Sequence, residues 1–252
     1  MNVTRTGFRA TRLRQQGSEA GGAFLRAGDA GIARLDRRHV YARDARGRAI
    51  TFEERDEPEG HEDRLVIPRS CVYVIALVIP QSPQTTARAP HALGGAAVAL
   101  RYSLTSLVAG SLARCIRALG YVAIPCGKDT ALSVPIAIDA GLGEASRTGR
   151  PISPRYGPNL RLAKVLTSLP LEVDRPVSFG VARFCSTCQK CARAYPARAL
   201  NLDREPPTRS GASSTPGVPH VVRRCPQVPG VLGFLRQWMQ HLCARLPLQQ
   251  AY

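Results

Sequence analysis

The sequence predicts an α/β or α+β fold, in which apolar strands and one long helix precede a cysteine-rich segment. The run from Val72 to Ile79 is apolar and rich in β-branched residues, which is typical of a central strand. Apolar residues recur every three or four positions from Tyr102 to Leu119, which is the period of a helix. Closely spaced cysteines follow from Cys185. With 252 residues, the chain is long enough for one large domain or two modest ones.

The first part of the chain mixes short apolar groups with turn residues. Residues 1 to about 20 are expected to be a basic lead-in. The stretch from Ala23 to Phe52 predicts a small helix and then a hairpin, with a turn signal at Arg46-Gly47. An acidic loop over residues 56–63 then leads to a short strand at Leu65 to Ile67.

The middle of the chain contains the clearest helix and its flanking strands. After a loop over residues 81–90, the predicted helix ends at Gly120, in the position that favours a C′ glycine. Cys115 lies on the apolar stripe of this helix, so we expect it in the core. Three further pieces are predicted: a strand at Tyr121 to Pro125, a short helix at Ser133 to Gly141, and a long basic loop from Gly141 to Arg161.

Three cysteines stand at C-x2-C-x2-C spacing, namely Cys185, Cys188 and Cys191. Bacterial ferredoxins use C-x2-C-x2-C-x3-C-P to bind [4Fe–4S] clusters, and here the fourth position is Tyr195, followed by Pro196. The spacing therefore predicts a partial ferredoxin-like iron–sulfur segment, with the three cysteines as metal ligands in a loop. A zinc knuckle or reactive surface thiols are the alternatives, although zinc sites usually add a second cysteine pair, and none follows.

The charge of the chain is strongly positive, at +17 with a pI near 10.5. Of the 35 basic residues only three are lysines, and the arginines are scattered rather than grouped, without a recognised binding motif. We therefore expect no nucleic-acid partner. No export signal and no transmembrane segment is predicted, so a cytoplasmic or peripheral membrane location is expected.

Several phrases resemble the corrinoid and iron–sulfur reductive dehalogenases over roughly Ala23 to Val218. These phrases are GIARLDRRHVYA, LGYVAIPCGKDTALSVPIAIDAGLGEASRTG, ISPRYGPNLRLAKVLTSLPLEVDRPVSFGVARFC and the cysteine run. The resemblance implies an α+β fold with an incomplete, nitroreductase-like, corrinoid-binding domain and a partial ferredoxin-like segment. It also implies a cobamide and 4Fe–4S clusters as cofactors, an organohalide substrate, and a ferredoxin-like protein or membrane anchor protein as electron donor.

The resemblance also assigns site residues. Tyr102 corresponds to the proton donor of the family, Lys128 to a neighbour that tunes it, and Arg161 to an active-site arginine. Cations beside a phenol stabilise the phenolate that remains after proton transfer. Each residue also has an ordinary interpretation, as an aromatic at the start of a helix, a solvated turn residue and a loop cap, respectively.

The sequence departs from the family pattern after the first cysteine run. The second cluster motif is absent, and Cys225 and Cys243 are too far apart to replace it. Around Trp238 and Met239, permitted codons spell GSGCNTCARVCPYNK one base over, so we hypothesise a frame change near Gly217-Val218 that sequencing of the coding DNA would test.

The sequence therefore predicts an N-terminal unit (1–60), a corrinoid-binding part (61–178), a partial cluster segment (179–218) and a frameshifted tail (219–252). The expected function is that of an impaired reductive dehalogenase. An epoxyqueuosine-reductase-like protein and a non-enzymatic metal-binding remnant are the alternatives.

Overall fold

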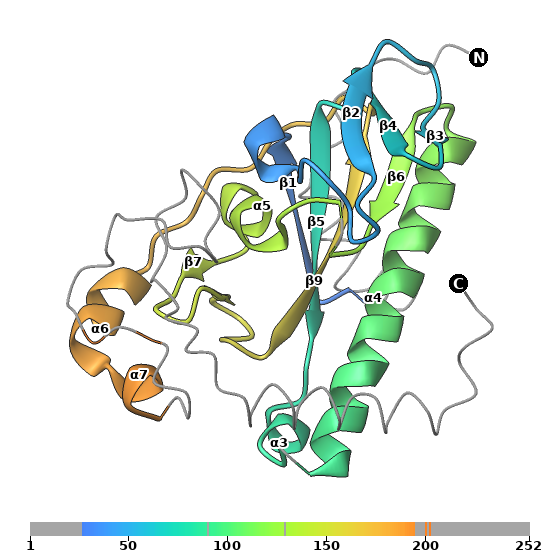
Figure 1. Cartoon of the computed structure of the whole chain (residues 1–252). Coiled ribbons are helices and arrows are strands. Elements are labelled where there is room, and N and C mark those ends of the chain that lie inside the picture. The colour runs from blue at the N-terminus through green and yellow to red at the C-terminus, as the bar shows by residue number, and fades with distance from the viewer. Residues whose placement is uncertain (1–26, 90, 129, 195–199, 201, 203–252) are drawn as a thin grey trace. The chain divides into compact units, whose positions relative to one another are not determined.

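The computed structural model describes residues 27–89, 91–128, 130–194, 200 and 202 (Figure 1). The chain divides into two compact units, the first formed by Met1–Ala145 with Arg150–Val181 and the second by Ser146–Gly149 with Ala182–Tyr252. The predicted lead-in, Tyr195, and the frameshift region from residue 219 lie outside the described residues.

A four-stranded antiparallel sheet forms the centre of the first unit (Figure 1). Its order is β1 (Asp29–Arg34), β5 (Tyr73–Pro80), β9 (Leu160–Thr167) and β6 (Ala123–Cys126). The prediction of a central strand at residues 72–79 is confirmed, because β5 lies inside the sheet with six consecutive buried residues. β6 confirms the strand expected at 121–125 within two residues.

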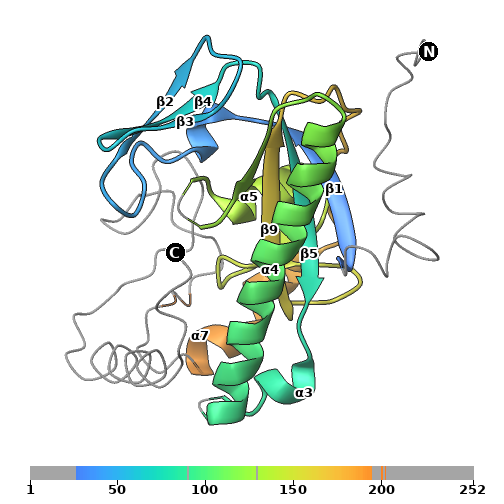
Figure 2. The ribbon, with the colours of Figure 1, turned by 90° about the vertical axis from the view of Figure 1, so that its right-hand side faces the viewer.

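Helices cover both faces of this sheet, so two apolar cores form (Figure 2). Residues at odd positions of β5, such as Ile75 and Leu77, pack with the long helix α4 (Ala92–Ala118). Residues at even positions, such as Val74 and Val78, pack with α5 (Ser133–Asp139) on the other face. The alternation follows from the pleat of a strand and explains why β5 is apolar throughout.

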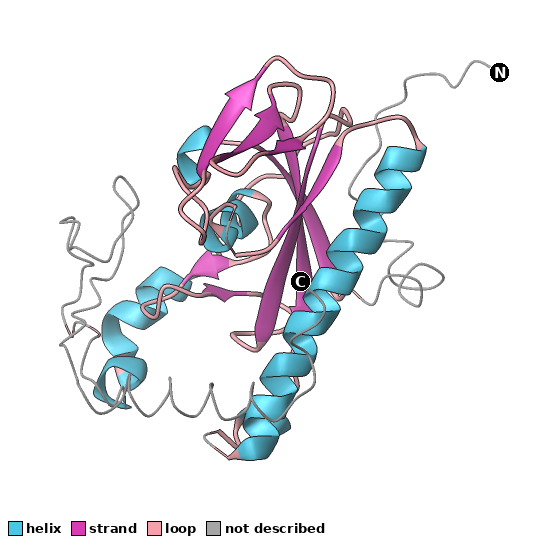
Figure 3. Cartoon of the chain, turned by 45° about the vertical axis from the view of Figure 1, so that its right-hand side comes forward, coloured by secondary structure: helices cyan, strands magenta, loops and turns pink. Residues whose placement is uncertain are grey.

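Helix α4 lies along the sheet and begins ten residues before the predicted start (Figure 3). Gly120 has φ +84°, which confirms the predicted stop at a left-handed C′ residue. Cys115, expected in the core, is exposed, because the sheet contacts the face that carries Val108, Leu112 and Ile116. Helix α4 is long and apolar enough to cross a membrane. Core helices of soluble proteins can have the same length and composition.

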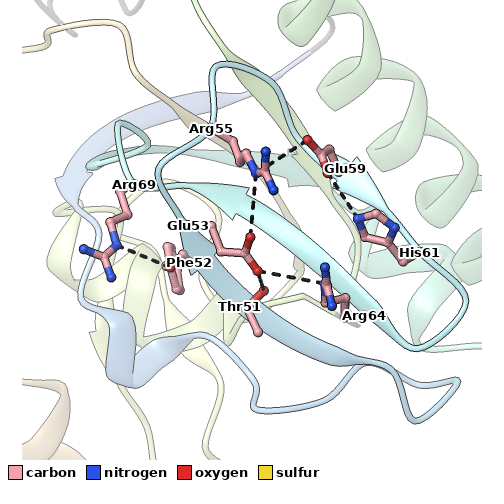
Figure 4. A network of polar contacts seen from close by, with 8 residues as sticks. All are labelled: Thr51, Phe52, Glu53, Arg55, Glu59, His61, Arg64 and Arg69. Carbon is pink, nitrogen blue, oxygen red and sulfur yellow. Dashed lines mark hydrogen bonds and ion pairs between the residues drawn. The ribbon is translucent and has the colours of Figure 1, made fainter.

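A small sheet of order β2-β4-β3 precedes β5 in the chain. It consists of β2 (Ala49–Glu53), β4 (Arg64–Pro68) and β3 (Glu59–Gly60). Figure 4 shows its polar surface, on which Glu53 lies 3.7 Å from Arg55 and 3.9 Å from Arg64. The side chains in these ion pairs are between 34% and 50% exposed and the separations are long, so each pair contributes little to stability.

The structure corrects the expected start of the fold. The stretch predicted as a small helix contains β1 and a 3-10 turn, η1 (Arg37–His39), because β1 pairs with β5 along its whole length. The turn at Arg46-Gly47 is present, with Gly47 at φ +83°. The hairpin is reduced to one bridge, Arg43↔Ala49, since β2 pairs instead in parallel with β4.

Strands also interrupt the segment predicted as a long loop over 141–161. It contains β7 (Glu144–Ala145), paired with β8 (Pro151–Ile152), and the start of β9. A short helix, α3 (Pro83–Thr86), lies within the loop expected at 81–90, and Ser82 caps it. The short helix expected at 133–141 is confirmed as α5.

Candidate functional site

Tyr102, Lys128 and Arg161, which the sequence places far apart, meet in the first unit. The Lys128 Nζ atom lies 4.3 Å from the centroid of the Tyr102 ring. The Cζ atom of Arg161 lies 5.0 Å from the same centroid. Two cations therefore lie within the range of cation–π attraction of one phenol ring.

The fold explains how each side chain reaches this place. Tyr102 lies one helical turn before Thr105, which is buried on the sheet-facing side of α4. Arg161 pairs with Ile79 and alternates with Ala163, which packs in the core beneath α4, so its side chain emerges on that same face. Lys128 lies in the turn that follows β6, the edge strand beside β9.

Two buried nitrogen atoms without a hydrogen-bond partner in the described part of the chain lie on β9 and directly after β5. The Nε atom of Arg161 is buried and has no hydrogen-bond partner among the described residues. The same holds for Nε2 of Gln81, whose side chain is 6% exposed and whose backbone N–H continues the β5–β9 ladder by bonding to the Asn159 carbonyl. Unpaired buried donors are costly, so their presence is expected where another group completes a site.

The cysteine run lies in helices rather than in the predicted loop. Helix α6 (Val181–Cys188) carries Cys185 and Cys188, and α7 (Lys190–Ala194) carries Cys191, with Gln189 between them at φ +51°. All three thiols are free, the first two half-buried and the third exposed. No group of three or more potential metal ligands occurs in the described part of the chain, so as placed the cysteines do not fit a preformed cluster site.

Two side chains from the AGLGEASR phrase support the start and the middle of α6. In the first unit, Glu144 Oε2 accepts hydrogen bonds from the backbone N–H groups of Phe179, Gly180 and Val181, at 2.9 to 3.1 Å. A carboxylate at a helix N-terminus is stabilised by these free donors. In the second unit, the buried Arg147 donates twice to the Cys185 carbonyl oxygen, at 2.7 and 3.1 Å.

No protein-family model matches the chain. The tetrachloroethene reductive dehalogenase of Sulfurospirillum multivorans is 38% identical over 185 residues, which cover 68% of this chain and 37% of that protein. The enzyme of the same name from Dehalobacter restrictus is 45% identical over 133 residues, 53% of this chain and 24% of that protein. The chain is a homologue of the reductive dehalogenases. It spans between about a quarter and just over a third of the length of these relatives.

Solved structures agree with this relationship. A catabolic reductive dehalogenase in complex with 3-bromo-4-hydroxybenzoic acid superposes on this chain with a TM-score of 0.61 at 28% sequence identity. The match covers 72% of this chain and 24% of the solved one. A second solved reductive dehalogenase, described with a B12-dependent mechanism, gives the same values. Epoxyqueuosine reductase of Lactococcus garvieae is 35% identical over only 69 residues, 27% of this chain.

These findings confirm that this chain has a mixed α+β fold, which matches part of the reductive dehalogenase structure. The structure brings Tyr102, Lys128 and Arg161 together, whereas their roles stay predictions. Sequence reasoning missed the buried Gln81 and Lys164 as well as the contacts of Glu144 and Arg147. The only signal for the last two was their position in the AGLGEASR phrase, and nothing local distinguished the first two.

Proposed function

We propose that this homologue forms the proton-donor side of a reductive dehalogenase active site. The overall reaction would consume an organohalide, two electrons and one proton, and would yield the hydrogenated carbon and a halide ion. A cobamide, when bound, would supply the electrons to the carbon–halogen bond. The contact of Lys128 and Arg161 with the Tyr102 ring is the observation that supports this proposal.

Tyr102 would act as the general acid. Its hydroxyl would donate a proton to the carbon that loses halide, and the phenolate left behind would carry a negative charge. Lys128 and Arg161 would stabilise that charge through Coulomb attraction, which is strong where water is partly excluded. The half-buried position of Tyr102 and the buried, unpaired Nε of Arg161 support such a setting.

Halide release would test the proposal. The chain would be incubated anaerobically with cobamide, a chemical reductant and either tetrachloroethene or 3-bromo-4-hydroxybenzoate, and the rate compared with that of cobamide alone. Tyr102→Phe should remove most of any acceleration by the protein, since general acid catalysis typically contributes about 10²- to 10⁴-fold. Tyr121→Phe, at an exposed tyrosine beyond the end of α4, is the matched control and should leave the rate unchanged. Equal rates for wild type and Tyr102→Phe, or no acceleration by wild type, would contradict the proposal.

We also propose that electron delivery in this chain is impaired. Tyr195 stands where the cluster pattern has its fourth cysteine, and a phenol is a poor substitute for a thiolate at an iron–sulfur site. Since the three remaining cysteines do not fit a preformed site, we derive no electron-transfer step through them. Iron and sulfide analysis after anaerobic reconstitution should give less than two clusters per chain, and a full complement of two would refute the impairment.

A metal-binding remnant without catalytic activity is the second candidate. The free state of Cys185, Cys188 and Cys191 favours it, because three thiols in seven residues can adapt to zinc as well as to iron. Zinc in stoichiometric amount after aerobic purification, with no halide release, would support this candidate over the enzyme.

A further inference from the structure

Among the described residues, Lys164 is the largest side chain that is almost completely buried, with 1% of its surface exposed. It lies in β9, opposite Ala76 of β5 and Cys126 of β6, on the face that packs with α5. Burial of an ammonium group in an apolar core costs free energy unless hydrogen bonds compensate it. The Lys164 Nζ atom donates to the Gly127 carbonyl oxygen at 2.6 Å and to the Ser133 hydroxyl at 2.9 Å.

These two bonds attach both ends of one segment to a single point on β9. Gly127 follows the last residue of β6 and immediately precedes Lys128, while Ser133 is the first residue of α5. Both Gly127 and Lys128 are exposed, so apolar packing does not fix the start of this segment. Farther along, the Tyr41 N–H bonds to the Thr130 carbonyl.

Strand β9 therefore carries one cation of the candidate site and is bonded to the backbone next to the other. Arg161 leaves one face of the strand and contacts the Tyr102 ring directly. Lys164, three residues later, leaves the opposite face and holds the backbone of the residue before Lys128.

We propose that Lys164 is a positioning residue that holds the turn after β6 so that Lys128 lies against the Tyr102 ring. Its side chain leaves the face of β9 opposite to Arg161, and it acts through the Gly127 carbonyl. The consequence for catalysis rests on the proposed function, whereas the structural effect does not.

Lysine spectroscopy tests the structural effect directly. The chain has only three lysines, Lys128, Lys164 and Lys190, so selective ¹³C-lysine labelling gives three resolvable side-chain environments. The Hε protons of Lys128 should be displaced upfield by the ring current of Tyr102, and Tyr102→Leu should remove the displacement and assign the signal. In Lys164→Met, most of the displacement should be lost, while circular dichroism shows that the fold is retained.

The control variant is Ser133→Ala, which removes one bond and leaves the Gly127 bond, so the Lys128 signal should keep its displacement. An unchanged signal in folded Lys164→Met would overturn the inference. If that variant does not fold, Lys164→Arg keeps the charge but has a longer, planar head group that cannot occupy the same place. A Lys128 signal that keeps its full upfield displacement in Lys164→Arg would likewise overturn the inference, and loss of that displacement would support it.

Halide release separates this inference from the proposed function. If both hold, Lys164→Met and Lys128→Met should lower the rate by similar factors, and the double variant should lose no more than either single variant. If wild type releases no halide but its Lys128 signal depends on Lys164, the proposed function fails and the positioning role stands. If halide release depends on Lys128 but not on Lys164, the positioning role fails alone.

Discussion

At the scale of single residues, the candidate site combines stabilising contacts with unpaired groups. Lys128 and Arg161 contact one aromatic ring, and such contacts contribute about 0.5 to 2 kcal/mol each. By contrast, Gln81 buries an amide nitrogen that has no partner among the described residues. A residue that costs stability in this way is expected where a ligand or another part of the protein supplies the missing partner.

Replacing Gln81 by methionine tests whether its unpaired amide lowers stability. Gln81→Met keeps the volume and removes the unpaired donor, so the free energy of unfolding should rise by up to about 1 to 3 kcal/mol. Urea denaturation measures the change. Gln84→Met, at an exposed position of α3, is the control and should have little effect. A lower stability of Gln81→Met would show that the amide is already paired.

At the scale of elements, α4 and β9 provide the framework of the site, since they carry Tyr102 and Arg161. Two glycines in and just after α4 have open space around the position of an added Cβ, namely Gly110 in the body of the helix and Gly120 at the C′ position beyond its end. Of these two glycines, only Gly120 has a positive φ, of +84°. The pair therefore separates the effect of backbone conformation from that of packing.

Alanine should have opposite effects at these two positions. Gly110→Ala should stabilise the protein by about 0.5 to 1 kcal/mol, because alanine loses less backbone entropy in a helix. Gly120→Ala should destabilise it by about 1 to 2 kcal/mol, because the left-handed conformation brings Cβ too close to the backbone. Thermal unfolding of the two variants measures both changes. A change of the same sign in both would contradict the helix end that the structure shows.

At the scale of the whole molecule, which has a net charge of +17, stability in acid is expected to depend on carboxylates whose pKa is lowered by folding, such as Asp44. Asp44 is buried, and burial by itself would raise its pKa. Hydrogen bonds from the Arg48 side chain and from the backbone N–H groups of Arg48 and Arg46 outweigh burial and hold the pKa of Asp44 below its ordinary value of 3.8.

The lowered pKa predicts a loss of stability in acid. Because the folded-state pKa lies below the unfolded-state value of 3.8, the contribution of Asp44 is present above that pH and is lost as the pH falls through the folded-state pKa. Asp44→Asn should thus be less stable than wild type at neutral pH and show a smaller loss of stability below pH 3.8. Denaturation at a series of pH values measures this, with Asp56→Asn, at an exposed residue, as control. Parallel curves for wild type and Asp44→Asn would contradict the prediction.

The sequence by itself determined the elements whose signal is local. Strand β5 and the end of α4 were predicted from hydrophobic period and glycine chemistry, and the family was predicted from its phrases. Three of the residues that the resemblance assigned to the site lie together in the structure, although no periodicity joins them.

Only the tertiary structure decided the rest, because those features depend on partners distant in the chain. β1 forms a strand because it pairs with β5. β9 joins β5 to β6, although no strand was predicted at its position. Cys115 is exposed because a different face of α4 packs against the sheet. The burial of Lys164 is explained in part by the Gly127 carbonyl, 37 residues earlier, which accepts a hydrogen bond from its Nζ atom. A hydrogen bond over such a sequence separation leaves no local pattern, so only the folded chain reveals it.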